Sequence, residues 1–141
     1  MKNITRLTDL EIKIMGVLWE HDQCLTSQEI ADYLKDDKIS AASVMQAMKR
    51  LVGKKAVTVS DLVPVSRVYA RAFSPNYSKE EFLAKEFGRL QKFVSNSNRI
   101  NITEITASLL DNDENQDINL EDVEELQRLI EHKKKQLLDG E

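Results

Sequence analysis

The hydrophobic residues of this 141-residue chain change their spacing after Lys55, and this change restricts the possible folds more than any other feature. Before Lys55, apolar residues recur at steps of three and four, which is typical of one buried face of an α-helix. After it, Val57 and Val59 flank a polar residue, and residues 67–73 alternate in the same way, which is typical of β-strands. The first half of the chain is therefore predicted to form helices and then a two-stranded hairpin.

Capping residues mark where the first helices begin. Two Thr-x-x-Glu segments, starting at Thr8 and Thr26, have the spacing of a capping box, in which the hydroxyl and the carboxylate each accept from a backbone N–H. Ser40 can cap a third helix in the same region. The helices predicted from these signals cover residues 9–21, 27–35 and 41–54.

The segment between the two predicted strands, residues 60–66, contains Pro64 and is predicted to be a protruding loop. Three helices followed by such a hairpin are the layout of a winged helix-turn-helix domain. We therefore expect a mainly α fold with a small β-hairpin, in which this domain occupies residues 1–75.

Three further helices are predicted in residues 76–141. Capping pairs start at Ser78 and Asn119, and a shorter helix is predicted between them, at about residues 101–110. In the last helix, apolar residues recur at steps of three, four and seven, which gives a narrow seam typical of helix pairing. Because this part has more apolar surface than short helices can cover alone, we expect it to form a helical dimerisation domain. The residues predicted to form the dimer surface are Phe82, Phe87, Leu90, Phe93, Leu109, Val123, Leu126, Ile130 and Leu137.

Basic residues are concentrated in one segment of an acidic chain. The formal net charge is −4, which at first sight argues against a nucleic-acid partner. Residues 38–75, however, carry seven lysines and arginines against Asp61 alone, a net charge of +6, whereas residues 76–141 carry −6. Such a run of charges is often only a solvated face. Since binding depends on where charges lie, the acidic average does not exclude nucleic acid.

The third predicted helix carries polar residues on the face opposite its buried stripe of Val44, Ala47, Met48 and Leu51. Short hydrogen-bonding side chains suit the floor of a DNA major groove, and a glutamine can read adenine through two hydrogen bonds. The surrounding lysines and arginines suit phosphates, and the arginines of the hairpin can follow the DNA backbone or a minor groove. The residues predicted to bind DNA are Ser40, Ala42, Ser43, Gln46, Lys49, Arg50, Lys54, Lys55, Arg67 and Arg71.

Simpler roles are open to several of these residues. Ser43 lies in the first turn of a helix, and Gln46 is a good helix former for an exposed position. Arg67 and Arg71 can keep an edge strand soluble. Their joint placement favours double-stranded DNA as the partner. The alternative is a helical protein-interaction module, in which the terminal seam binds a partner and the basic hairpin has no role.

Six segments of the chain resemble a known family. They are residues 7–11, 14–19, 26–30, 40–55, 67–69 and 122–126, which read LTDLE, IMGVLW, TSQEI, SAASVMQAMKRLVGKK, RVY and DVEEL. In sequence and order they are similar to the penicillinase-repressor and copper-repressor family of winged-helix transcriptional regulators. The resemblance implies a homodimer that binds a palindromic operator and represses transcription, with the three C-terminal helices making the dimer. It also implies DNA contacts for Ser43, Gln46, Arg50 and Arg67.

The chain departs from this family in four places, one of which is a wing that is longer than usual, from Leu62 to Ser66. Ala41 and Ala42 stand where the family usually has Pro and Lys, so one contact of the recognition helix is expected to be lost. The tail, residues 133–141, lacks the paired Cys-x-Cys motifs of copper-responsive members. Residues 107–110 lack the Asn-Phe bond at which antibiotic-responsive members are cut. The resemblance therefore implies neither copper capture by thiolates nor cleavage at that position.

Other chemistry is not indicated by the sequence. His21 and Cys24 lie three residues apart, but the chain has two histidines and no second ligand pair, so no metal site is predicted. It has no phosphate-binding glycine loop and no serine-elbow motif, so we expect neither an enzyme nor a cofactor. The single thiol, which is redox-sensing only if its pKa is lowered, fits a reducing compartment. Because no apolar run resembles a membrane span or a secretory signal, we expect a cytoplasmic protein.

Overall fold

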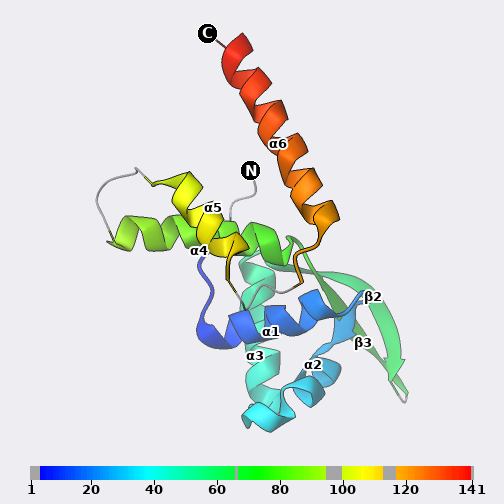
Figure 1. The fold of residues 1–141 in the computed structure, drawn as a ribbon. Coiled ribbons are helices and arrows are strands. Elements are labelled where there is room, and N and C mark those ends of the chain that lie inside the picture. The colour runs from blue at the N-terminus through cyan, green and yellow to red at the C-terminus, as the bar shows by residue number, and fades with distance from the viewer. Residues whose placement is uncertain (1–3, 66, 95–99, 113–116, 141) are drawn as a thin grey trace. The chain divides into compact units, whose positions relative to one another are not determined.

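The computed structural model describes residues 4–65, 67–94, 100–112 and 117–140 (Figure 1). The chain divides into two compact units, Met1–Asn96 and Ser97–Glu141. The elements of the first unit are α1 (Asp9–Glu20), β1 (Leu25–Thr26), α2 (Ser27–Tyr33), the 3-10 turn η1 (Lys35–Asp37), α3 (Ala41–Gly53), β2 (Val57–Val65), β3 (Val68–Pro75) and α4 (Lys79–Val94). Those of the second unit are α5 (Ile102–Leu110) and α6 (Leu120–Asp139). The expected class, a mainly helical protein with an N-terminal winged helix-turn-helix and C-terminal helices, is confirmed. The assignment of separate functions to residues 1–75 and 76–141 stays a prediction.

The helices begin where the capping residues predict. In α1, the Thr8 hydroxyl accepts from the Glu11 backbone N–H at 3.3 Å, and the Glu11 carboxylate accepts from the Thr8 backbone N–H at 2.9 Å. The same box forms at Thr26 in α2 and at Asn119 in α6. Ser40 caps α3 by accepting from a backbone N–H three residues on. These starts depend on contacts within one helical turn, which is why the sequence alone could locate them.

The predicted hairpin of β2 and β3 forms, and a strand that the sequence did not predict, β1, extends it to a three-stranded antiparallel sheet with the order β1-β3-β2. The additional strand, β1, pairs with β3 between Leu25 and Phe73. It is two residues long, too short to produce an alternating pattern that a sequence can reveal. β1 therefore joins the start of α2 to the sheet, although no local sequence pattern predicts this strand.

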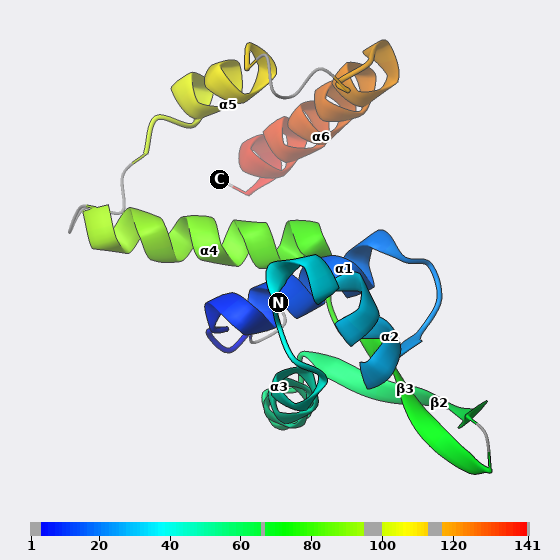
Figure 2. The same cartoon turned by 90° about the horizontal axis from the view of Figure 1, so that it is seen from below.

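The prediction of a protruding loop at residues 60–66 is wrong, because β2 continues to Val65, which pairs with Val68. Ser66 lies outside the described residues. Pro64 is accommodated because β2 is an edge strand, where one side makes no ladder hydrogen bonds. A register shift between Val59 and Asp61 keeps the two strands paired along the hairpin. The wing is thus a long strand pair, which protrudes from the helices in both Figure 1 and Figure 2.

The core of the first unit lies among its helices and the base of the sheet. The predicted stripe of α3, formed by Val44, Ala47, Met48 and Leu51, is buried, as expected. It belongs to one cluster with apolar residues of α1 and α2, including Ile14, Met15, Leu18 and Ile30. Because this stripe faces the core, the other side of α3 is left exposed.

The start of α4 packs on the same core. The Trp19 indole N–H donates to the Tyr77 carbonyl at 2.8 Å, and the ring centroids of Trp19 and Phe82 are 5.4 Å apart. Phe82 is 4 % exposed. The structure thus places one of the nine residues predicted for the dimer surface inside the core of the first unit.

Candidate nucleic-acid interface

The outer face of α3 is exposed along its whole length. The residues predicted there, Ala42, Ser43, Gln46, Lys49 and Arg50, are all exposed, and Ser40 at the cap is exposed as well. The Ser40 hydroxyl also donates to the Ser43 hydroxyl at 2.9 Å, so these two side chains are linked before any ligand binds. The face therefore offers a row of short polar groups flanked by cations, which matches the depth and polarity of a major groove.

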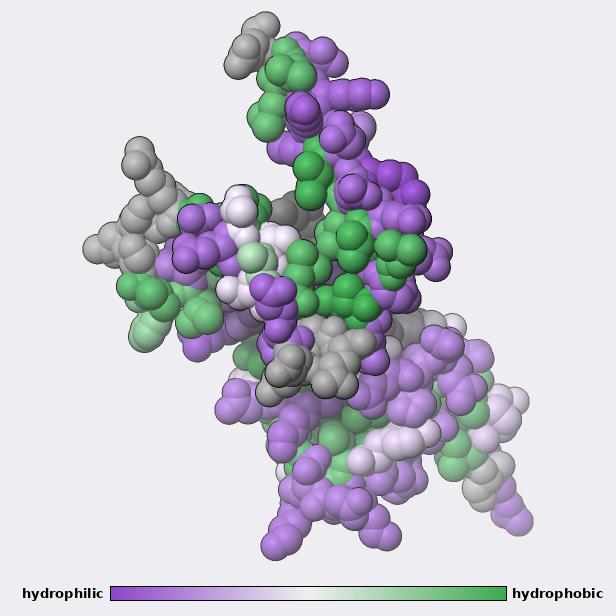
Figure 3. All heavy atoms as spheres, viewed as in Figure 1, coloured by the Kyte–Doolittle hydropathy of each residue, from purple (hydrophilic) through white to green (hydrophobic). Residues whose placement is uncertain are grey.

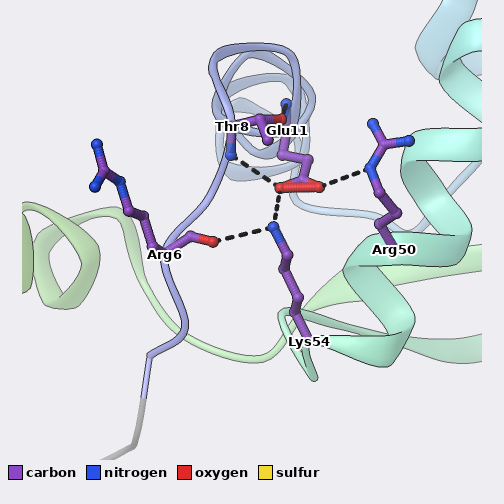
Figure 4. Close-up of polar contacts among 5 residues, drawn as sticks. All are labelled: Arg6, Thr8, Glu11, Arg50 and Lys54. Carbon is purple, nitrogen blue, oxygen red and sulfur yellow. Dashed lines mark hydrogen bonds and ion pairs between the residues drawn. The ribbon is translucent and has the colours of Figure 1, made fainter.

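Two of the predicted phosphate-binding residues are engaged inside the protein. The Glu11 side chain is fully buried, and its carboxylate accepts from Lys54 Nζ at 2.5 Å and from Arg50 Nε at 3.1 Å. Lys54 Nζ also donates to the Arg6 carbonyl at 3.0 Å. Figure 4 shows the carboxylate between the two cations and the Thr8 backbone N–H. We call Glu11, Arg50 and Lys54 the Glu11 clamp, which joins the start of α1 to the end of α3.

The clamp keeps the buried carboxylate ionised. Burial by itself raises the pKa of Glu11, but hydrogen bonds from Lys54, the Thr8 backbone and Arg50 outweigh it and hold the pKa below its ordinary value of 4.5. A buried charge is tolerated only when it is paired and hydrogen-bonded, as it is here. Lys54, with 25 % of its side chain exposed, thus has a structural partner that its sequence context did not reveal.

Arg50 belongs to the Glu11 clamp and also presents part of its guanidinium group to solvent. Its Nε is bound to Glu11, whereas its Nη atoms form no hydrogen bond to another described residue and point away from the carboxylate in Figure 4. The side chain is 46 % exposed. A guanidinium held at Nε loses less conformational freedom when its two Nη groups bind a phosphate.

Glu11 belongs to the candidate site although the sequence predicts only a capping role for it. A signal for it does exist. Glu11 lies three and four residues before the buried Ile14 and Met15, so it stands on the apolar stripe of α1. A carboxylate on a buried stripe requires a cation, and the i, i+4 pair of Arg50 and Lys54 on α3 supplies two.

The wing and the end of α3 carry the remaining cations. Arg71 lies on β3, opposite Leu62, and Arg67 lies in the turn at the hairpin tip; both are exposed. Lys55 follows α3 with φ 60°, a left-handed backbone that turns the chain toward β2, and its carbonyl accepts from Asn76 Nδ2 at 2.9 Å. The structure brings Arg71 and Lys49 together, because both line one cavity between α3 and the hairpin.

The residues predicted for the dimer surface, apart from Phe82, are apolar and largely uncovered. No described residue of α5 or α6 is buried, and Figure 3 shows apolar side chains along one side of α6 with hydrophilic ones along the other. The uncovered side chains and their exposed fractions are Phe87 42 %, Leu90 60 %, Phe93 88 %, Leu109 55 %, Val123 38 %, Leu126 37 %, Ile130 62 % and Leu137 62 %.

The described residues bring together no group of three or more metal-ligating side chains. Cys24 is half-buried and free. None of the described helices is long and apolar enough to cross a membrane.

Comparison with known proteins places this geometry in a family. The family model described as penicillinase repressor matches residues 7–132. The penicillinase repressor of Bacillus licheniformis is 24 % identical over 135 residues, which cover 95 % of this chain and 96 % of that protein.

Two solved structures are similar to part of the chain. The solution structure of the DNA-binding domain of the repressor BlaI is 26 % identical, covering 57 % of this chain and 93 % of that domain, with a TM-score of 0.43. The structure of monomeric Bacillus licheniformis BlaI in complex with the blaP half-operator is 24 % identical over the same shares, also with a TM-score of 0.43.

The family match spans both units, from the start of α1 into α6. It confirms the resemblance seen in the sequence and the expectation of a regulator rather than an enzyme, and it decides against the helical interaction module. The chain belongs to the penicillinase repressor family of winged-helix, DNA-binding transcriptional repressors.

Proposed function

We propose that the chain acts as a homodimer in the cytoplasm, where each protomer places α3 in the major groove of one half of a palindromic operator. The observation that supports this proposal is the division of α3 into a buried apolar stripe and an exposed polar face. In the proposal, Ser43 and Gln46 contact bases, while Ser40, Ala42 and the cations surround them. The Arg50 Nη groups, Lys49, Lys55 and the wing residues Arg67 and Arg71 bind phosphates, and Lys54 acts mainly through the Glu11 clamp.

A second copy of the chain is the proposed cover for the apolar side of α6. Val123, Leu126, Ile130 and Leu137 recur with the spacing of a helix-pairing seam. A dimer with two recognition helices reads two half-sites related by the same symmetry, which is why a palindrome is expected. In the complex of the similar BlaI, a monomer is bound to a half-operator.

The salt dependence of DNA binding tests the proposed interface. A dimer that neutralises about six to eight phosphates should lose affinity with a slope of log K against log salt of roughly −5 to −7. The measurement is a fluorescence-anisotropy titration of a labelled operator duplex with the full chain, between about 50 and 200 mM salt. Genomic fragments that the purified protein retains supply the operator sequence. No binding at low salt, or an affinity that does not change with salt, would exclude the proposed interface.

Base reading and phosphate contact can be separated with two variants of neighbouring exposed positions on α3. Gln46→Ala should weaken operator binding by about 1–3 kcal/mol while leaving binding to an unrelated duplex nearly unchanged. Lys49→Ala should weaken binding to both duplexes and, because the dimer loses one phosphate contact per protomer, reduce the salt slope by about two. Equal losses on both duplexes for Gln46→Ala would show that this side chain does not read bases.

A further inference from the structure

A cavity of about 650 Å³ lies between α2, α3 and the hairpin of the first unit. This volume is within the range of small-molecule sites, roughly 300–1,000 Å³. Its walls are largely apolar, with Met45, Met48 and Val52 on the α3 side and Val65 and Phe73 on the sheet. All of these residues belong to one compact unit, so the cavity exists within a single chain.

The apolar wall residues include several that the fold leaves in contact with water. Met45 is 55 % exposed, Val52 is 41 % exposed and Val65 is 48 % exposed. Phosphate contacts do not account for them, since a DNA backbone surface is highly polar and charged. Covering such side chains with an apolar molecule is favourable because it removes their surface from water.

The described charged residues that line the cavity are all basic. Lys49 and Arg71 line it, and neither forms an ion pair with another described residue. No described residue that lines the cavity is acidic. Gln28, which also lines the cavity, is neutral and donates one amide N–H to Asp32 at 3.1 Å. A ligand that satisfies both features has an apolar body and one anionic group.

We propose that this cavity binds an amphipathic organic anion, whose apolar body lies against Met45, Met48 and Val52 and whose anionic group pairs with Lys49 and Arg71. Both cations also belong to the proposed phosphate-binding set. On the proposed function, therefore, ligand and operator compete for them, and the ligand releases the repressor from DNA. The cavity is the site of an effector that acts directly on the DNA-binding surface.

Methyl NMR of the full chain with ¹³C-labelled methionine tests the site without DNA. The probe is 1-naphthaleneacetate, and the matched neutral compound is 2-(1-naphthyl)ethanol, which has the same rings without the carboxylate. The methyl signals of Met45 and Met48 should move on titration because aromatic rings lie against them. Met15, which is fully buried and does not line the cavity, is the internal control and should not move.

Two variants check the chemistry of binding. Lys49→Gln with Arg71→Gln should weaken the naphthaleneacetate affinity by about tenfold and leave that of the alcohol unchanged. Val52→Phe should reduce binding of both compounds by narrowing the cavity, and an unmoved Met15 signal verifies its fold. Equal affinity of acid and alcohol for the wild-type chain would overturn the assignment of an anion.

The effect of the ligand on operator binding distinguishes this proposal from the proposed function. Naphthaleneacetate should raise the apparent Kd for the operator by a factor of one plus its concentration divided by its own Kd, whereas the alcohol should have a smaller effect. Saturation of the cavity with no change in operator affinity would overturn the competition. If DNA moves the signals of Met45 and Met48 but naphthaleneacetate does not, a deoxyribose or a thymine methyl fills the cavity and the ligand site is wrong. If the salt titration shows no DNA binding but naphthaleneacetate still binds, only the proposed operator interface is contradicted.

Discussion

Replacement of Lys54 by methionine is expected to lower the free energy of unfolding by about 2–4 kcal/mol, the largest stability effect of any exposed or half-exposed lysine in the first unit. The variant keeps the length of the side chain but leaves the buried Glu11 carboxylate with Arg50 as its remaining cation. Arg50 cannot replace the lost partner fully, because its single Nε contact occupies the other carboxylate oxygen. Chemical denaturation followed by Trp19 fluorescence measures the effect.

The adjacent lysine supplies a matched control. Lys55 is exposed and forms no ion pair with another described residue, so Lys55→Met should change the free energy of unfolding by no more than about 0.5 kcal/mol. Its left-handed backbone is equally unfavourable for both side chains, so that cost does not change. If the two variants were equally stable, the clamp would have no energetic role.

A double variant tests whether the cost comes from the buried charge. Glu11→Gln removes the charge and can still accept from the Thr8 backbone N–H. The combination of Glu11→Gln and Lys54→Met should therefore be less destabilised than the sum of the two single variants. Additive losses would place the effect of Lys54 elsewhere, in its contact with the Arg6 carbonyl.

The same variants predict a pH dependence. Because the pKa of Glu11 is below 4.5 in the folded protein, its ionised form contributes stability above that value, and this contribution is lost as the pH falls through the folded pKa. In Lys54→Met, burial still raises the pKa while one lowering contact is gone. The stability difference between wild type and Lys54→Met should be full near pH 7 and shrink as the pH falls through the folded Glu11 pKa of the variant toward the lower Glu11 pKa of the wild type. Lys55→Met should show no such change.

Replacement of Ile130 by glutamate is expected to dissociate the dimer and to weaken binding to the full operator by about 100-fold or more. A carboxylate in the proposed seam would be buried without a partner, and the two half-sites would then have to be bound by separate protomers. Since α6 has no buried residue within the chain, the substitution removes no contact from the described core. Light scattering at micromolar concentration should give the monomer mass of 16.2 kDa instead of twice that value.

His132→Glu is the matched control for this variant. Two residues correspond to about 200° around a helix, so His132 lies on the side of α6 opposite Ile130. This variant should remain dimeric and bind the operator with nearly wild-type affinity. A wild-type chain that stays at 16.2 kDa at micromolar concentration would contradict the dimer before any variant is made.

The helix starts and the faces of α3 could be predicted because they depend on neighbours in sequence. Capping residues at Thr8, Thr26 and Asn119 act within one turn, and a buried stripe repeats every three or four residues. The position of the basic segment, residues 38–75, is likewise a property of the chain alone. These features were sufficient for the fold class, and the resemblance to the repressor family rests on the same segments.

The features that sequence reasoning missed depend on partners far along the chain. β1 is a strand only because β3 lies beside it, and Pro64 fits a strand only because that strand is at the edge of the sheet. Phe82 is apolar and regularly spaced, and nothing local distinguishes its burial against Trp19 from a place on a dimer surface.

In the candidate site, too, some features follow from the local sequence and others from contacts between distant residues. Its residue types, the exposed face of α3 and the excess of cations follow from composition and helical spacing. Which cations are free follows from packing: Lys54 lies 43 residues from Glu11 and Arg50 lies 39 residues from it, yet both donate to one buried carboxylate. Lys49 and Arg71 face one cavity because the hairpin folds back beside α3. Local spacing determines which face a side chain occupies, but only the approach of distant elements determines whether its charge is already paired.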